Sequence, residues 1–360
     1  MTIPRKSRQN PAVREFILRN VPAHPTDIAT FAAKEFGLTR QSINRYLNRL
    51  EDEGLLAGLG KTTARRYDLK PISATCEQVE ITQGIQENEV WTKYIEPVAK
   101  NIPQNVKDIC YYGFSEMFNN VIDHSQAANS IISYKQTYTD IEMMVLDHGV
   151  GIFEKLQKHF GLVDQRTALL ELAKGKLTSD EVKHSGEGIF FTSRMFDEFS
   201  IRSGNLFYRK QRNDDWGWLI ETEDYVEHFQ GTVVTMKIST DADWTTQQVF
   251  EKFTIKDDDG GNPPFVKTHV PIFLGKYGSE QLVSRSQAKR VLARFDRFQE
   301  VFLDFTNVPT IGQPFADEIF RVFQNQHPDI RIIATSTTPE VERMIAHVKG
   351  QSGGLLPSNN

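Results

Sequence analysis

The stretch YYGFSEMFNNVIDHS, residues 111–125, decides most about the fold. Its apolar residues recur with the period of an α-helix. Glu116, Asn120 and Asp123 are separated by four and three residues. This spacing predicts that a carboxylate, an amide and a second carboxylate share one face of the helix. The helix is therefore expected to present a polar row beside its apolar face.

Three glycine-containing motifs follow this helix along the chain. The run IEMMVLDHGVGIF (141–153) predicts a buried strand that ends at an aspartate and two glycines. HSGEGIFFTSRMF (184–196) places two glycines before an apolar helix, and GTVVTMKI (231–238) predicts a further strand. The candidate site residues in these motifs are Asp147, Gly149, Gly151, Gly186, Gly188 and Thr232. Each motif alone occurs by chance in many chains, so the interpretation depends on their order.

As an ordered set, these motifs resemble the Bergerat fold over about residues 85–240. That ATPase superfamily includes DNA gyrase, MutL, the heat-shock chaperone ATPase, histidine kinases and anti-sigma serine kinases. The resemblance implies an α/β sandwich that binds ATP together with Mg²⁺. Residues 71–105 contain no histidine, whereas histidine kinases carry a phosphoaccepting histidine there, so autophosphorylation is not expected. No second domain with a catalytic lysine is recognisable afterwards, which weakens an assignment to gyrase or MutL.

The resemblance gives each matched residue a physical task. Asn120 corresponds to the amide that joins the Mg²⁺ shell with phosphate oxygens and water. Glu116 corresponds to the acid that orients and deprotonates the nucleophile, and it is the candidate catalytic residue. Asp147 corresponds to the carboxylate that accepts a hydrogen bond from the adenine amine, and Thr232 to the hydroxyl that shares an ordered water with the base. Asp123 either lines the nucleotide site or caps the helix.

The four glycines of the two boxes are assigned to close approach. Gly149 and Gly151 keep the backbone near the base, where a side chain would intrude. Gly186 and Gly188 match a second glycine box, whose backbone amides at a helix start hold phosphate oxygens.

Charged residues around the second box have alternative roles. Glu187 departs from the small or apolar residue often found inside that box. Lysines between the two boxes either reach the triphosphate or are solvated loop residues, and they are Lys174, Lys176 and Lys183.

Residues 1–70 are basic, with 13 lysines or arginines against 7 aspartates or glutamates, although the whole chain has a net charge of −5. Residues 11–69 predict three short helices followed by a hairpin. In the third helix Ile43, Leu47 and Leu50 form one buried stripe. This pattern resembles a winged helix-turn-helix, which implies binding of double-stranded DNA, although some winged helices mediate only protein contacts. The candidate DNA-binding residues are Arg40, Gln41, Ser42, Asn44, Arg45 and Arg49 on the third helix, and Lys61, Arg65 and Arg66 in the wing.

Residues 265–350 alternate between strands and helices, which predicts an α/β layer domain. The run VFLDFTNVPTIGQPFADEIFRVF (301–323) resembles STAS-like domains of unknown function and the anti-sigma-factor antagonists. In those antagonists a Bergerat-type kinase phosphorylates a serine after the central strand. The matching positions 311–314 have no hydroxyl, and Thr310 is near but not aligned. This domain is expected either to dock a protein partner or to act as a structural cap.

The chain has 360 residues and two cysteines, which lack metal-binding spacing. Its N-terminus has no apolar stretch of the kind found in signal peptides. No apolar run reaches the ~18 residues of a membrane helix. These features predict a cytoplasmic protein that makes no membrane contact. The sequence leaves open whether the chain forms a homodimer.

We therefore expect a multidomain α+β and α/β protein. Its predicted parts are a winged helix (1–70), a connector (71–105), a Bergerat-type ATP-binding domain (106–242), a linker (243–264), a STAS-like α/β domain (265–350) and a flexible tail (351–360). The expected function is transcriptional regulation, in which bound and hydrolysed Mg-ATP changes the contact with DNA or a protein partner. The alternatives are an anti-sigma-like serine/threonine protein kinase acting on a separate STAS-type partner, and a non-hydrolysing ATP sensor.

Overall fold

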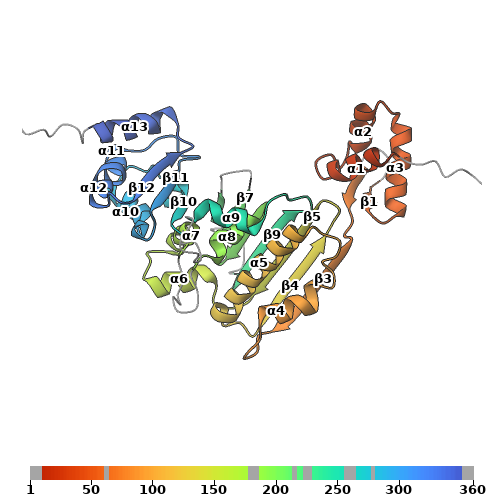
Figure 1. Ribbon diagram of the computed structural model, residues 1–360, viewed down its shortest axis with the longest axis horizontal. Helices are drawn as coiled ribbons and strands as arrows, with labels where there is room; N and C mark the ends of the chain where they lie inside the picture. The colour runs from red at the N-terminus through yellow and green to blue at the C-terminus, as the bar shows by residue number, and fades with distance from the viewer. Residues whose placement is uncertain are drawn as a thin grey trace, which may run out of the picture.

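The computed structural model describes residues 10–60, 65–176, 186–212, 217–221, 229–254, 265–276 and 280–350. These residues form an N-terminal helical unit, a central domain on one seven-stranded sheet, and a C-terminal domain with a three-stranded sheet. Figure 1 shows the N-terminal unit and the C-terminal domain attached at two different places on the central domain. None of the described helices is long and apolar enough to cross a membrane.

The N-terminal unit contains the three helices and the hairpin expected from the sequence. Its elements are α1 (Pro11–Asn20), α2 (Ile28–Phe36), α3 (Arg40–Asp52) and the antiparallel strands β1 (Leu56–Leu59) and β2 (Arg66–Leu69). Thr39 caps α3 by accepting a hydrogen bond from the backbone N–H of Ser42 (3.1 Å). Ile43, Leu47 and Leu50 of α3 are buried in a core that belongs to this unit alone.

The seven strands of the central sheet pair antiparallel in the order β3-β4-β5-β9-β6-β7-β8. They are β3 (Ser73–Glu80), β4 (Asn129–Gln136), β5 (Asp140–Asp147), β6 (Glu198–Ser203), β7 (Leu206–Gln211), β8 (Gly217–Glu221) and β9 (Thr232–Ser239). The prediction that 71–105 is a connector is wrong, because β3 is an edge strand of this sheet. Only Val79 of β3 is buried, so this strand has almost no hydrophobic alternation that could reveal it.

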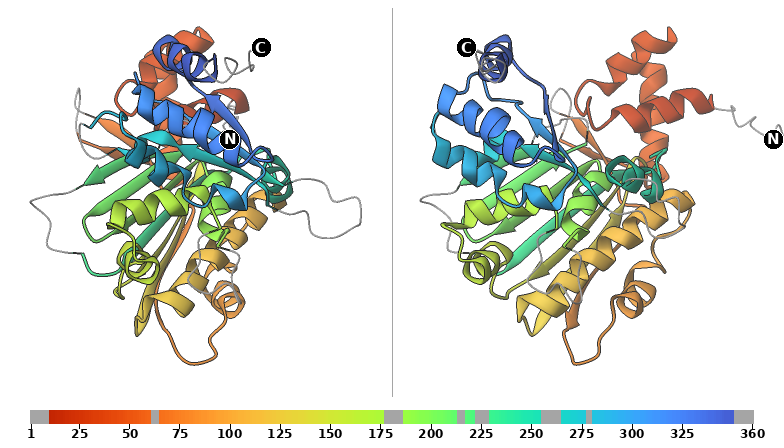
Figure 2. Two further views of the ribbon diagram at one scale, coloured as in Figure 1. Left: turned by 90° about the vertical axis from the view of Figure 1, so that its left-hand side faces the viewer. Right: turned by 60° about the vertical axis from the view of Figure 1, so that its left-hand side comes forward.

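Figure 2 shows α5 lying along one face of the central sheet. The helices of this domain are α4 (Glu87–Val90) with the π-helical turn Trp91–Ile95, α5 (Gln104–Asn120), α6 (Ile152–Phe160), α7 (Gln165–Lys174) and α8 (Gly188–Met195). α5 contacts β5, β9 and α8. Gly113 permits the approach to α8, because a Cβ at this position would lie 2.4 Å from the ring of Phe196.

The described part of the predicted linker 243–264 belongs to the central domain instead. It contains α9 (Thr246–Phe253), which begins with a capping box formed by Thr245 and Gln248. The ring of Phe250 packs against Tyr112 in α5, with 5.5 Å between the ring centroids, and against Phe191 in α8, with 4.6 Å between them. The linker prediction is therefore wrong for this part, since the acidic, glycine-rich turn that suggested a boundary (257–261) lies farther along, outside the described residues.

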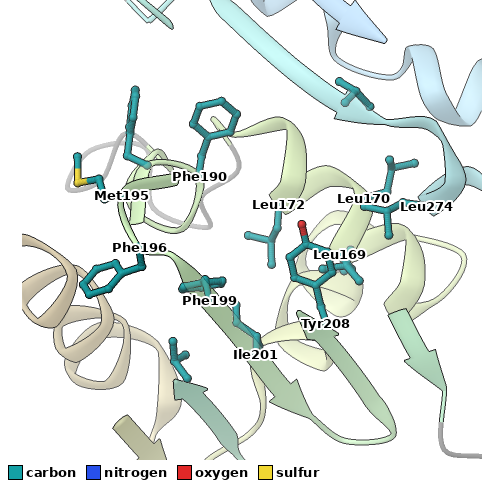
Figure 3. Close-up of a cluster of buried hydrophobic side chains, with 14 of the residues drawn as sticks. Leu169, Leu170, Leu172, Phe190, Met195, Phe196, Phe199, Ile201, Tyr208 and Leu274 are labelled. Carbon is teal, nitrogen blue, oxygen red and sulfur yellow. The ribbon is translucent and has the colours of Figure 1, made fainter. Parts of the chain in front are cut away.

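The C-terminal domain has the alternating strands and helices that the sequence predicts. Its three parallel strands, in the order β10-β11-β12, are β10 (Lys267–Pro271), β11 (Glu300–Asp304) and β12 (Arg331–Thr335). Its helices are α10 (Arg285–Leu292), α11 (Gln313–Asp317) continued by the π-helical turn Glu318–Phe323 and α12 (Gln324–Gln326), and α13 (Pro339–Gly350), with 3₁₀ turns at Ile272–Gly275 and Phe295–Arg297. One hydrophobic core continues from the central domain into this one. Figure 3 shows Leu274 of the C-terminal domain beside Leu170 of α7.

Candidate functional site

Helix α5 positions two of the three polar residues predicted to share its face. Glu116 and Asn120 are both half-buried in the last two turns of α5. The helix then widens into the π-helical turn Val121–Ser125, which contains Asp123. Because a π-helical turn holds more residues than an α-helical one, Asp123 is rotated away from the position that its spacing implies. Its carboxylate is exposed and acts electrostatically on Lys155 of α6.

Asp147 and Thr232 lie directly opposite each other at the ends of β5 and β9. Asp147 is only 4% exposed, and its Oδ1 accepts a hydrogen bond from the backbone N–H of Gly149 (2.8 Å). Burial raises the pKa of Asp147, and that hydrogen bond opposes the rise. Thr232 uses its hydroxyl oxygen to accept from the backbone N–H of Ile152 (3.1 Å). Two motifs far apart in the sequence therefore share one buried polar corner.

The first glycine box fits tightly beside this corner. A Cβ on Gly149 would lie 1.9 Å from the carbonyl oxygen of Ser125, at the end of the π-helical turn. Gly151 has a φ of +77°, and its Cβ would lie 2.7 Å from the hydroxyl of Ser203. Gly231, which the sequence analysis did not assign, has a φ of +111°, and its Cβ would lie 1.9 Å from the carbonyl oxygen of Asp147. Glycine is required at all three positions, so the backbone is bare around the corner.

The second glycine box meets α5 at the candidate base. Gly186 has a φ of +73°, and Gly188 starts α8. A Cβ on Gly188 would lie 2.0 Å from Oε2 of Glu116. Tyr112, one helical turn before Glu116 and unassigned from the sequence, hydrogen bonds with the same carboxylate. Its spacing of four from Glu116 is the signal that could have identified it.

The lysines considered for the triphosphate serve a different purpose where the structure describes them. Lys174 is 1% exposed; its Nζ pairs with Glu171 (2.5 Å) and donates to the carbonyl oxygen of Ala293 (2.9 Å) in the C-terminal domain. Nζ of Lys176 donates to the carbonyl oxygen of Arg297 (2.8 Å). Both lysines therefore contact the C-terminal domain: Lys174 is a buried residue at the end of α7, and Lys176 is a half-buried residue just after it. Lys183 lies outside the described residues.

The site fits a nucleotide better than a protein-only metal centre. Among the described residues, no group of three or more histidines, cysteines or acids could hold a metal ion. Asn120 offers a single amide oxygen, which suits Mg²⁺ because this ion keeps waters and takes most ligands from substrate phosphates. The absence of side chains at Gly149, Gly151 and Gly188 lets Ser125, Ser203 and Glu116 approach the backbone more closely than any other residue would allow. The roles of the individual residues stay predictions.

The candidate DNA-binding residues divide into two groups. On α3, Gln41 and Asn44 are exposed, and so are Arg40, Arg45 and Arg49, which form no ion pair with the described residues; Asn48, missed by the sequence analysis, is exposed on the same side. Ser42 is half-buried and close to Thr39.

In the hairpin, the arginines are already paired. Arg65 pairs with Glu51 (2.7 Å) and lies over the ring of Tyr67, whereas Arg66 pairs with Asp68 (2.8 Å). Lys61 lies outside the described residues. Among the described residues of this unit, the arginines of α3 are therefore without an ion pair, whereas those of the hairpin are paired.

Comparison with known families agrees with two of the three predicted domains. Residues 88–207 match the histidine kinase-like ATPase domain, and residues 287–342 match a STAS-like domain of unknown function. No curated protein matches the chain. The chain therefore contains a histidine kinase-like ATPase domain followed by a STAS-like domain. Neither match includes the N-terminal unit, so its identity as a winged helix stays a prediction.

Proposed function

We propose that this protein is an ATP-dependent regulator in which Mg-ATP, bound by the central domain, controls how the outer domains contact DNA or a protein partner. One observation carries the proposal: in and beside the region similar to histidine kinase-like ATPases, Asp147 lies opposite Thr232, and Glu116 lies against Gly188 at the start of α8. The buried carboxylate at one place and the helix start at the other suit a purine nucleotide with its phosphate chain.

Each group would hold one part of the nucleotide. The buried carboxylate of Asp147 accepts the hydrogen bond of the adenine amine, and the Thr232 hydroxyl binds the water beside the base. Asn120 completes the Mg²⁺ shell, and the bound ion would neutralise phosphate charge. The backbone N–H groups from Gly186 and Gly188 hold phosphate oxygens at the start of α8.

Glu116 would act as the base of the reaction. Its carboxylate accepts the proton of the attacking group, which is water in an ATPase and a serine or threonine hydroxyl of a separate STAS-type partner in a kinase. The chain's own STAS-like domain is a poor phosphoacceptor, because residues 311–314 have no hydroxyl. Gly312 also packs tightly on Val283, since a Cβ at position 312 would lie 2.7 Å from the Cα of Val283. With radiolabelled ATP, release of free phosphate supports the switch, and label on the partner supports the kinase.

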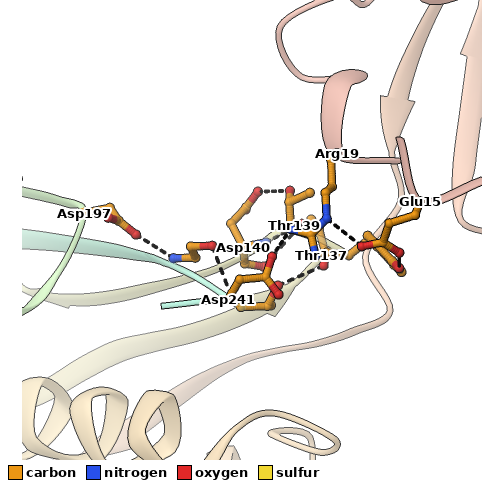
Figure 4. Close-up of polar contacts among 10 residues, drawn as sticks. Glu15, Arg19, Thr137, Thr139, Asp140, Asp197 and Asp241 are labelled. Atoms are coloured by element: carbon orange, nitrogen blue, oxygen red, sulfur yellow. Dashed lines mark hydrogen bonds and ion pairs between the residues drawn. The ribbon is translucent and has the colours of Figure 1, made fainter. Parts of the chain in front are cut away.

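The N-terminal unit is joined to the central domain by a small polar contact (Figure 4). Arg19 of α1 pairs with Asp241, which follows β9, and with Glu15 (2.5 Å). Glu15 in turn accepts a hydrogen bond from Tyr138, between β4 and β5. This contact lies at the Asp140 end of β5, seven residues from Asp147, or roughly 23 Å along the strand. A strand of the central sheet thus connects the two sites.

DNA is the ligand that the N-terminal unit fits best. Arg40, Arg45 and Arg49 place three cations on one exposed helix, and Gln41 and Asn44 add groups able to contact base edges. The STAS-like domain would dock the protein partner.

Calorimetry of the full chain with Mg²⁺ and a non-hydrolysable ATP analogue tests the proposal. Asn120→Ala should abolish Mg²⁺-dependent binding, because Asn120 is the residue assigned to the metal. Asn119→Ala is the matched control, since Asn119 is also a half-buried amide on α5 but points a different way. Equal affinity of all three proteins would refute the assignment, and absence of binding to the wild type would refute the function.

A further inference from the structure

The carboxylate of Glu116 lies against the first residue of α8. A Cβ on Gly188 would stand 2.0 Å from Oε2 of Glu116 and 2.9 Å from its carboxyl carbon. The contact therefore exists only because residue 188 has no side chain. In the described structure the candidate base thus lies at the helix start to which phosphate oxygens are assigned above.

The backbone N–H groups at the start of α8 need a hydrogen-bond acceptor. The first N–H groups of any helix have no partner within the helix, and the positive end of the helix dipole attracts anions. The N-cap residue of α8, Glu187, makes no side-chain capping hydrogen bond to these groups. A carboxylate or a phosphate can satisfy the same need, so the two compete for one place.

Tyr112 holds the carboxylate of Glu116. The phenol hydrogen bonds with Glu116, and burial, together with the charges of Glu116 and Glu187, keeps the pKa of Tyr112 far above its usual range. The hydroxyl therefore stays protonated and donates. The ring of Tyr112 packs edge-on against Phe250 of α9 (5.5 Å), which fixes where the hydroxyl points.

Helix α8 itself is firmly anchored, so the side chain of Glu116 is the part that can move. Phe190, Phe191, Met195 and Phe196 are each no more than 1% exposed. Figure 3 shows Phe190, Met195 and Phe196 within the hydrophobic cluster around this helix. Moving α8 would expose these side chains, whereas rotating one carboxylate costs much less.

We propose that Glu116 is a phosphate placeholder: in the nucleotide-free protein Tyr112 holds its carboxylate at the start of α8, and the triphosphate displaces it. Displacement frees the carboxylate to face the nucleophile, so the base becomes available only when ATP is bound. Tyr112 is then a positioning residue, and the Glu116–Gly188 contact is autoinhibitory. This inference rests on the proposed function, because it assumes that ATP binds at this site.

Two variants that keep a negative charge at position 116 distinguish a carboxylate that occupies the phosphate position from one that only repels the phosphate. Glu116→Asp keeps the negative charge but is one methylene shorter, so its carboxylate no longer reaches Gly188. Tyr112→Phe keeps Glu116 intact but removes the hydrogen bond that holds it. Both should bind a non-hydrolysable ATP analogue with Mg²⁺ about tenfold more tightly than the wild type, equivalent to about 1.4 kcal/mol. Adenosine, which has no phosphate, should bind the wild type and both variants with the same affinity.

Calorimetry on the full chain distinguishes the outcomes, with Asp108→Asn as the control for an exposed carboxylate elsewhere on α5. Tighter binding of the analogue by Glu116→Asp or Tyr112→Phe, with adenosine unchanged, supports the placeholder. Wild-type affinity for the analogue in both variants overturns it, even if Glu116→Gln binds more tightly, because charge alone then explains the effect. Tighter adenosine binding overturns it as well, since the whole pocket has changed. If the wild type binds no nucleotide, the proposed function fails, which is a different result.

Discussion

The buried ion pair between Lys174 and Glu171 is expected to hold the C-terminal domain on the ATPase domain, and Lys174→Ala tests this. Lys174 is 1% and Glu171 is 2% exposed, with 2.5 Å between their charged atoms. Removing one partner of a buried pair costs about 3–5 kcal/mol, because the other charge stays buried. Nε of Arg294 remains 3.8 Å from Glu171, so we expect the lower end, about 3 kcal/mol.

Chemical denaturation followed by circular dichroism measures this loss. Lys289→Ala is the control, because Lys289 is a largely exposed lysine of α10, 3.9 Å from Glu318, and such surface pairs contribute about 0–1 kcal/mol. The double variant Lys174→Met/Glu171→Leu should recover most of the stability, since it removes both charges of the buried pair. If Lys174→Ala unfolds at the same denaturant concentration as Lys289→Ala, the ion pair does not secure the domain contact.

Four further changes test the site and the DNA surface. Asp147→Asn should lose ATP binding. At pH 7 it should also unfold at a higher denaturant concentration than the wild type, because burial raises the pKa of Asp147 and so disfavours its charged form in the folded protein. This difference should vanish below the unfolded pKa of ~3.9, where Asp147 is protonated in both states. Glu116→Ala should retain ATP but lose about 10²–10⁴-fold in turnover, measured as phosphate release or transfer. Gly149→Ala should abolish binding by calorimetry, because its Cβ meets the carbonyl of Ser125. Arg45→Ala should reduce the salt slope of duplex binding by about 0.9, whereas Arg65→Ala, already paired with Glu51, should change it less.

Local patterns in the sequence were enough to predict most elements. Thr39 caps α3 as expected, and the alternation of residues 265–350 produced the parallel sheet of the C-terminal domain. The two family matches agree with the motifs around Asp147 and with the STAS-like run. These features are encoded within short windows, which is why one sequence reveals them.

Features that depend on contacts between distant segments could not be predicted. The polar edge strand β3 forms because β4 offers it hydrogen bonds, not because its own residues are apolar. A lysine at position 174 is expected at the surface, yet Lys174 is buried and donates a hydrogen bond to the carbonyl oxygen of Ala293 in another domain. The contact of Glu116 with Gly188 joins residues 72 positions apart, and no pattern within either motif reveals it.

Nucleotide bound in the central domain is expected to change how tightly the N-terminal unit binds DNA. Fluorescence anisotropy of a labelled duplex, titrated with the full chain at fixed salt, measures this most directly when repeated with and without Mg²⁺ and a non-hydrolysable ATP analogue. We expect the analogue to shift the duplex affinity of the wild type by about fivefold or more and to leave that of Asp147→Asn unchanged. Equal affinity for duplex in both conditions, in a wild-type protein that calorimetry shows to be saturated with the analogue, would contradict it.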